Sequence, residues 1–258
     1  MDRSQELRPM PLWMSLLCFG IPTGVGLLQM YLLLPALARA GVPLLWNYMV
    51  SMVSMFPLLL GAALLAVRLE GGSLSWDYLR RRWRIKGLSR REWAWTAGLV
   101  LVYAGGSIAL MPSATWLTTV LPLPLPLGLP HALDPRVVKS TIPGDFFGIP
   151  LAGNWPIALL HLGILVLNVG SEELWWRGVV LPRQELVYGR WTWLLHGILW
   201  TLFHAPFWWN WISLLPATLS LSFVVSRLKN STPGIIAHFV LNGLALVMTV
   251  LGVLGLGS

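Results

Sequence analysis

Long stretches without a charged residue are the feature that most constrains how this chain folds. Residues 155–169, WPIALLHLGILVLNV, carry no formal charge, and several other stretches are equally apolar. A helix needs about 20 apolar residues to cross the roughly 30 Å of hydrocarbon in a bilayer. Within that hydrocarbon, a helix satisfies its backbone polar groups internally. The sequence therefore predicts an all-α fold, a polytopic bundle of transmembrane helices.

The composition agrees with a membrane protein and argues against a nucleic-acid-binding one. Only 11% of the 258 residues are charged and 56% are hydrophobic, whereas soluble domains carry about 25% charged residues. The net charge of +8 would suggest nucleic-acid binding in a soluble protein. Basic residues also collect in the cytoplasmic loops of membrane proteins. We therefore expect the lipid bilayer as a partner, and no nucleic acid.

The apolar segments predict about seven membrane helices, and a count of eight is also compatible with them. The sequence has no internal repeat, no Gly-rich phosphate loop and no soluble domain, so residues 1–258 are expected to form a single integral membrane domain. The first segment is too long for a signal peptide, whose apolar core has about 7–15 residues. The expected helices cover residues 12–38, 43–67, 93–111, 156–187, 191–209, 212–227 and 232–255.

The distribution of lysine and arginine predicts the orientation of the chain. With the N-terminus inside, fifteen basic residues fall in inner segments and only Arg39, Arg136 and Lys139 fall outside. Cytoplasmic loops carry such an excess, which predicts a multi-pass protein of the cell membrane with a cytoplasmic N-terminus and an outer C-terminus. The inner residues are Arg3, Arg8, Arg68, Arg80, Arg81, Arg82, Arg84, Lys86, Arg90, Arg91, Arg177, Arg183, Arg190, Arg227 and Lys229.

The segment between residues 112 and 154 is the least regular part of the chain. Its stretch LPLPLPLGLP, residues 121–130, cannot be the interior of a helix because each proline removes a backbone donor. We expect an extended apolar loop at the outer surface, with a short re-entrant piece near residues 139–152. The tryptophans of WWNW, residues 208–211, are predicted to form an outer aromatic belt.

Charged and polar side chains interrupt three of the apolar segments at a similar depth. Glu172 is expected roughly 20 Å from the inner boundary, His204 also roughly 20 Å, and His238 and Asn242 roughly 14 and 20 Å, at 1.5 Å per helical residue. Ionisable groups at such depth usually face a bundle interior or a watery cavity. The sequence therefore predicts that these groups meet inside the bundle.

The spacing within each segment assigns neighbours to these groups. Glu173 and Arg177 are four residues apart and can pair on one helix face, which leaves Glu172 without that partner. Trp175 and Trp176 are expected over the face of Glu172. His238 and Asn242 project together, as do Trp200 and His204 on their helix, and Pro206 is expected to loosen the backbone beyond His204.

Two chemical devices fit a carboxylate with two histidines. In the first, Glu172 and one histidine deprotonate a water molecule, while Asn242 and the other histidine stabilise the oxyanion that forms. In the second, the histidines and a carboxylate hold Zn²⁺, which activates the water. The compact zinc-protease signature H-E-x-x-H does not occur in the chain. We favour the site without a metal or other cofactor, and zinc remains the alternative.

The same residues resemble the motifs of a known family. EELWWR at residues 172–177 matches E-E-x-x-x-R, and HFVLN at 238–242 matches H-x-x-x-N. WTLFH at 200–204 is similar to F-x-x-x-H, with tryptophan in the phenylalanine position. In this order the motifs resemble the CPBP family, which comprises CAAX prenyl endopeptidases and bacteriocin-processing enzymes and is also called Abi.

The resemblance implies a glutamic-type intramembrane endopeptidase, with its catalytic half at about 155–255 and a cavity reached from the cytoplasmic side. It implies that Glu172 activates the water with help from His204, and that His238 and Asn242 form the oxyanion site. Glu173, Arg177 and Trp200 would have supporting roles, and Trp200 would alter the shape of the pocket more than its chemistry. The implied substrate is a membrane-associated or lipidated peptide or protein.

Two other classes of function use buried polar clusters. A membrane immunity factor or scaffold would use the cluster to bind a partner, without catalysis. A proton-coupled transporter would use Glu172 and the histidines as a proton relay, although the chain lacks the paired inverted repeats typical of many transporters. His131, His161 and His196 have no motif partners, and we interpret them as structural.

Overall fold

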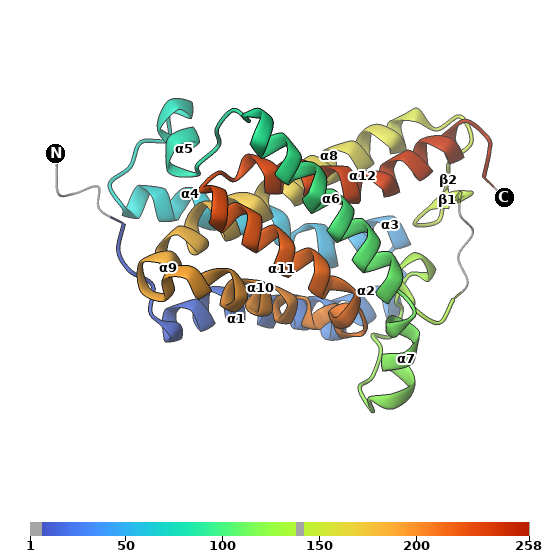
Figure 1. Cartoon of the computed structure of the whole chain (residues 1–258). Helices are drawn as coiled ribbons and strands as arrows, with labels where there is room; N and C mark the ends of the chain where they lie inside the picture. Colours follow the sequence, from blue (N-terminus) through green and yellow to red (C-terminus); the bar gives the residue numbers. More distant parts are fainter. Residues whose placement is uncertain (1–6, 138–141, 258) are drawn as a thin grey trace.

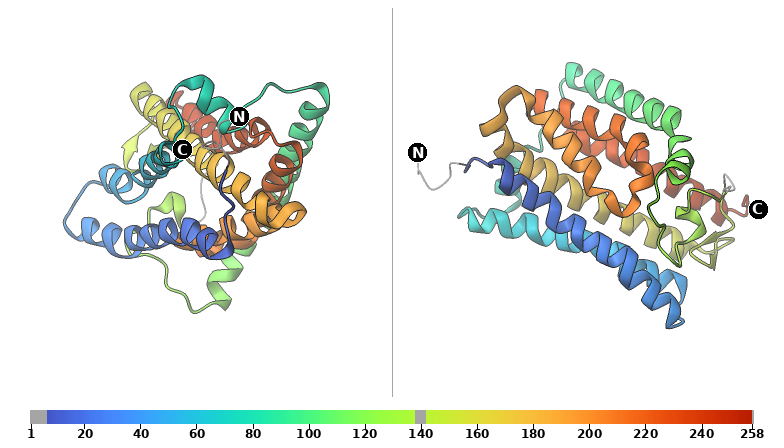
Figure 2. Two further views of the ribbon diagram at one scale, coloured as in Figure 1. Left: turned by 90° about the vertical axis from the view of Figure 1, so that its left-hand side faces the viewer. Right: turned by 90° about the horizontal axis from the view of Figure 1, so that it is seen from below.

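The computed structural model describes residues 7–137 and 142–257 of the chain. Within them the protein is a bundle of long helices. The N-terminal and C-terminal parts of the described chain lie at opposite ends of this bundle (Figures 1 and 2). Arg3, Lys139 and the start of the expected re-entrant piece lie outside the described residues. The helices that build the bundle are α1 (Leu12–Leu28), α2 (Leu34–Arg39), α3 (Leu44–Tyr48), α4 (Met55–Leu69), α6 (Arg90–Leu110), α8 (Trp155–Glu172), α9 (Leu181–Tyr188), α10 (Thr192–Phe203), α11 (Trp211–Leu228) and α12 (Thr232–Val253).

Shorter elements link or extend these helices. Three of them are wound as π-helices and continue a longer helix without a break: η2 (Gln29–Leu33), η3 (Met49–Val53) and η5 (Glu173–Val180). π-Helical turns are rare and are often found at functional sites. The remaining elements are α5 (Trp76–Arg82), α7 (Ser113–Val120), the 3₁₀ turns η4 (His131–Leu133), η6 (Gly189–Trp191) and η7 (Ala205–Asn210), and the strands β1 (Asp145–Phe146) and β2 (Ile149–Pro150).

The described residues contain six helical runs that are long and apolar enough to cross a membrane. The longest, Trp155–Phe203, contains two of the predicted helices, because the chain turns back at η6, where Gly189 has φ of 52° (Figure 1). The predicted multi-pass helical bundle is therefore confirmed. The predicted end of the helix at 191–209 is wrong, because α10 ends at Phe203 and residues 205–210 form a 3₁₀ turn. Pro206 has no backbone N–H and therefore cannot donate the hydrogen bond that would continue the α-helix.

The core of the bundle lies where α1, α6, α10, α11 and α12 meet the η5 segment. α11 packs against α6 and α10, and α12 packs against α8 and α6. The largest fully buried side chains of this core include Trp176, Leu181 and Leu221. Many large apolar side chains on the outer faces of the helices are exposed, as expected where lipid tails replace water around the protein.

The segment between α6 and α8 lies at the same end of the bundle as the C-terminus (Figure 1). Residues 121–130 form no helix, as predicted. The described part of the expected re-entrant piece, residues 142–152, is a short β1–β2 hairpin in place of a helix. The predicted aromatic belt is wrong for Trp208 and Trp209, which are only 3% and 1% exposed. Residues of α7 and the proline-rich loop, including Leu117 and Leu125, pack over these indoles and cover them.

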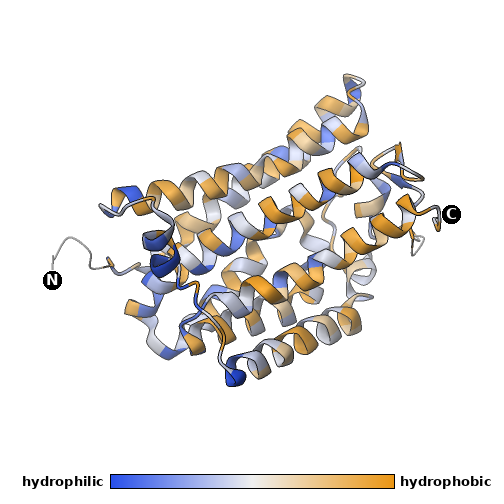
Figure 3. Ribbon diagram, turned by 90° about the horizontal axis from the view of Figure 1, so that it is seen from above, coloured by the Kyte–Doolittle hydropathy of each residue, from blue (hydrophilic) through white to orange (hydrophobic). Residues whose placement is uncertain are grey.

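The opposite end of the bundle carries most of the charge (Figure 3). Glu70 accepts hydrogen bonds from Arg82 at 2.6 and 2.7 Å and from Arg183 at 2.5 Å. Burial opposes ionisation of the Glu70 carboxyl, but these two arginines outweigh it and hold its pKa below the usual range. Glu185 pairs with both Arg84 and Lys229 at 2.8 Å. The basic residues that are expected to determine the orientation of the chain therefore also connect the loops of this end through ion pairs.

Candidate active site

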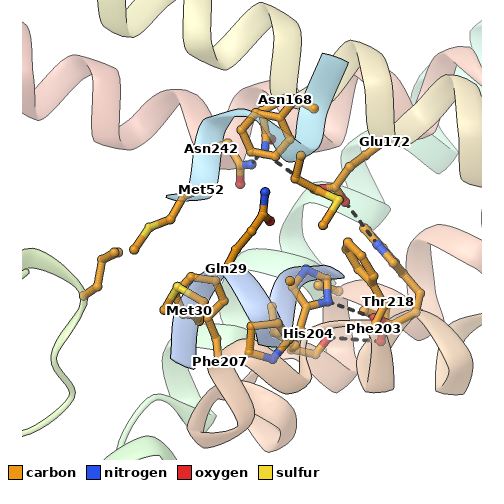
Figure 4. A pocket seen from close by; sticks show the side chains of 18 of the residues that line it. Gln29, Met30, Met52, Asn168, Glu172, Phe203, His204, Phe207, Thr218 and Asn242 are labelled. Atoms are coloured by element: carbon orange, nitrogen blue, oxygen red, sulfur yellow. Dashed lines mark hydrogen bonds between the residues drawn. The ribbon is translucent and has the colours of Figure 1, made fainter. Parts of the chain in front are cut away.

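A cavity of about 260 Å³ lies inside the bundle and contains the side chains that the sequence singled out (Figure 4). Glu172 from α8, Trp200 from α10, His204 and the α12 residues His238 and Asn242 all line it. These residues are far apart in sequence, so the prediction that they meet inside the bundle is confirmed. A cavity of this size holds several water molecules, since each occupies about 30 Å³.

Glu172 is the last residue of α8, where the chain changes from α-helical to π-helical winding, and it is only 5% exposed. Its Oε2 accepts a hydrogen bond from the indole Nε1 of Trp200 at 3.1 Å. Its Oε1 accepts a longer one from the Asn168 amide at 3.4 Å. Two neutral donors thus orient the carboxylate, and in the described residues no basic side chain lies within ion-pair distance of it.

Trp176 is not over the face of Glu172, contrary to the expectation. The wider turns of η5 change the direction of the side chains that follow Glu172. Trp176 is fully buried and stacks on Phe19 of α1, with ring centroids 4.3 Å apart. The indole that meets Glu172 belongs instead to Trp200. Trp200 therefore contributes a hydrogen bond, which the phenylalanine of the family motif could not make, and its effect is not limited to the shape of the pocket.

Glu173 joins Arg177 and His238 in a buried cluster. Its Oε1 lies 3.1 Å from Nη1 of Arg177, as the four-residue spacing predicted, and both side chains are 0% exposed. The same oxygen lies 2.9 Å from Nδ1 of His238 on α12. The Arg177 guanidinium lies 3.4 Å above the ring of Trp200. Arg177 is thus part of the bundle core and is not a loop charge that bears on the orientation of the chain.

The hydrogen bonds of the two histidines define which ring nitrogen carries a proton. His204 follows the end of α10, and its Nδ1 lies 2.8 Å from the carbonyl oxygen of Trp200. A carbonyl and a carboxylate can only accept hydrogen bonds, so Nδ1 is the donor in both His204 and His238. In a neutral ring, Nε2 is then left as an acceptor, and it becomes a second donor only when the ring is protonated.

Two amide side chains of the cavity, Asn168 and Gln29, were missed by sequence reasoning. Asn168 donates to Glu172 and accepts from the Asn242 amide at 3.1 Å, so it connects α8 with α12. Its position four residues before Glu172 was the signal that could have identified it. Gln29 of η2 also lines the cavity, and its amide donates to Ser54 at 2.9 Å. Its signal was a lone amide within the first apolar segment.

The other histidines and the question of a metal can be judged from the same geometry. His161 contacts Thr249 through Nδ1 at 2.9 Å, and His196 contacts Gln184 at 2.7 Å. Neither residue lines the cavity. Within residues 7–137 and 142–257, no three histidine, cysteine, aspartate or glutamate side chains are grouped as a metal site would require.

One comparison with known proteins gives a match. Residues 154–244 match a family model described as type II CAAX prenyl endopeptidase Rce1-like. This segment contains all three sequence motifs and every charged side chain of the cavity. No curated protein and no solved structure gives a significant match.

Proposed function

The Rce1-like match at residues 154–244 supports membership of the CPBP family, and from that premise we propose that this protein is an intramembrane endopeptidase that uses a glutamate-activated water. The observation that carries the proposal is the cavity itself. Glu172 from α8, His204 after the end of α10, and His238 and Asn242 from α12 line one chamber that is large enough for several water molecules. General acid–base chemistry requires such convergence before any other property.

In the proposed first step, a water molecule between Glu172 and His204 loses a proton to the Glu172 carboxylate as its oxygen bonds to the peptide carbonyl carbon. Nε2 of neutral His204 accepts the second hydrogen bond of this water and orients it. The hydrogen bonds from Trp200 and Asn168 hold the carboxylate in place. Glu172 then delivers the proton to the leaving nitrogen as the carbon–nitrogen bond breaks.

The oxyanion that forms in this step needs hydrogen-bond donors. One N–H of the Asn242 amide is used by Asn168, and the other is left for the oxyanion. His238 can donate from Nε2 only when it is protonated, because Nδ1 already donates to Glu173. The buried Glu173 carboxylate accepts the hydrogen bond from Nδ1 and so fixes the orientation of the ring. We therefore propose that Glu173 supports catalysis by orienting His238 toward the oxyanion.

The test uses purified protein in lipid nanodiscs and a fluorescence-quenched farnesylated CAAX-type peptide, a probe suggested by the description of the matched family. We expect Glu172→Gln to lower kcat by about 10²- to 10⁴-fold. The matched control is His161→Gln, a change on the same helix outside the cavity, which should leave cleavage unchanged. Cleavage by Glu172→Gln at the wild-type rate would overturn the proposal, and partner binding by the wild-type protein without any cleavage would favour the scaffold function.

A further inference from the structure

The cavity is displaced along the bundle away from the end that carries the basic loops. Several of its lining residues lie in the part of their helix that is remote from those loops. Gln29 and Met30 lie well past the middle of the run that starts at Leu12, and Tyr48 lies close to the start of the run that ends at Leu69. Phe207 follows the end of α10, and Leu133 belongs to the loop between α7 and β1.

The side chains that line the cavity are more exposed at the end remote from the basic loops and more buried near Glu172 and His238. Met52, Leu133 and Phe207, all on the remote side, are partly exposed. Glu172 and His238 are 5% and 4% exposed, so they form the floor. The passage from solvent to the proposed catalytic groups therefore starts at the end of the bundle formed by α7, η4 and η7, which is also the C-terminal end (Figure 1).

The structure closes the other side of the cavity. After Glu172 the chain continues toward Arg183 through Trp176, Arg177, Val180 and Leu181, which are all 0% exposed. Beyond this layer, Arg82 and Arg183 both bind Glu70, and Arg82 also donates to the carbonyl oxygen of Gly178 at 2.6 Å. A fully buried layer of side chains and an ion-pair network thus separate the site from the basic end.

The basic end is expected in the cytoplasm. With Arg177 removed from the count, fourteen lysines and arginines still lie in the inner segments and three lie in the outer ones. Loop charges of this bias determine orientation. We infer that the cavity opens to the extracytoplasmic side, and that its substrate is a peptide segment presented at the outer face of the membrane. Cytoplasmic access, which the family resemblance implies, would require the chain to be inserted the other way round.

This inference rests on the proposed function only in calling the peptide segment a substrate. The side on which the cavity opens is therefore tested without measuring proteolysis. In a Cys18→Ser background, which removes the single cysteine, one cysteine is introduced at Leu127 in the outer loop, at Ser73 near the basic end, or at Met52 in the cavity. Spheroplasts are treated with a charged, membrane-impermeant maleimide, and inside-out vesicles are treated in parallel. A charged reagent crosses the hydrocarbon poorly.

We expect Leu127→Cys and Met52→Cys to react roughly tenfold or more faster in spheroplasts, and Ser73→Cys to react faster in inside-out vesicles by a similar factor. The reverse pattern at Leu127 and Ser73 would show opposite insertion and overturn the inference. It would also be overturned if Met52→Cys reacted only from the inner side or from neither side. If the protein shows the expected labelling pattern but does not cleave the peptide, the result counts against the proposed enzyme and leaves the side of access established.

Discussion

Nδ1 of His238 lies 2.9 Å from Oε1 of Glu173, in a site where neither side chain is more than 5% exposed. The motif E-E-x-x-x-R thus provides two carboxylates with different partners. The first is oriented by an indole and an amide, and the second pairs with an arginine and a histidine. This division predicts that the two glutamates respond differently to the same substitution.

Glu173→Gln is expected to lower kcat about 10- to 100-fold, because His238 loses the carboxylate that accepts from its Nδ1 and orients its ring, and groups that orient functional histidines typically contribute that much. The Michaelis constant should change little. Stability should fall by about 3–5 kcal/mol, since buried Arg177 is left without its counterion. The measurements are steady-state kinetics and thermal unfolding in nanodiscs.

The control for that variant is Glu185→Gln, which also removes an ion-paired carboxylate but lies at the basic end, away from the cavity. It should lower stability without changing the kcat of the folded protein. Equal kcat losses in both variants would mean that Glu173 acts only through stability.

Trp200→Phe is expected to lower kcat about tenfold or more, because the hydrogen bond to the Glu172 carboxylate disappears and a bond to a charged group contributes about 1.5–3 kcal/mol. The ring over Arg177 is retained in this variant, so folding should be largely preserved. Trp193→Phe on the same helix, whose ring faces Phe223 and not the cavity, is the matched control. Full activity in Trp200→Phe would show that the family's phenylalanine serves equally well here.

Gly26→Ala is expected to impair activity through the loop that carries His204. A Cβ atom at position 26 would lie 2.8 Å from Cγ of Pro206, so α1 or η7 must shift. Overpacking of this kind costs about 1–3 kcal/mol. Gly24→Ala on the same helix has no atom within 4 Å of the new Cβ and should be neutral. The comparison is made by thermal unfolding and by kcat/KM, and equal values for the two variants would contradict the close contact.

The ion pairs of Glu70 predict an acid-sensitive contribution to stability. Because its pKa is lowered in the folded protein, the contribution is complete above the ordinary carboxyl value near 4.5 and is lost as the pH falls through the folded value. Glu70→Gln should therefore be less stable than wild type by about 1–2 kcal/mol at neutral pH. The two proteins should converge below the folded pKa. A gap that stays constant from pH 7 to the acid limit would contradict this role of Glu70.

The preference for a metal-free mechanism predicts that chelators do not inhibit the purified enzyme. Elemental analysis should find far less than one zinc per chain in fully active protein. Stoichiometric zinc, with activity lost to a chelator and restored by adding zinc, would support the alternative in which the metal activates the water.

Sequence reasoning was most successful where depth and periodicity carry information. The apolar segments located the helices, and counting residues inward placed Glu172, His204 and His238 at a common level. Reasoning failed where local winding deviates from the α-helix. η5 turns Trp176 toward Phe19 and not toward Glu172, and a π-helical turn has no pattern that a 3.6-residue period reveals.

Tertiary contacts account for the other differences. The pairing of His238 with Glu173 depends on how α12 meets α8, which neither segment encodes alone. Trp208 and Trp209 are buried because α7 and the proline-rich loop fold over them. Hydropathy indicated only that these indoles belong near a membrane boundary.

The wall opposite the proposed catalytic groups includes Gln29, Met30, Met52 and Met55, which lie in the first two helical runs and outside the matched segment 154–244. Methionine side chains are flexible and adapt to differently shaped apolar surfaces. The proposed function thus assigns peptide selectivity and bond hydrolysis to separate stretches of the chain. Randomising the four wall positions in a combinatorial library would retarget such an enzyme while leaving its reactive groups untouched.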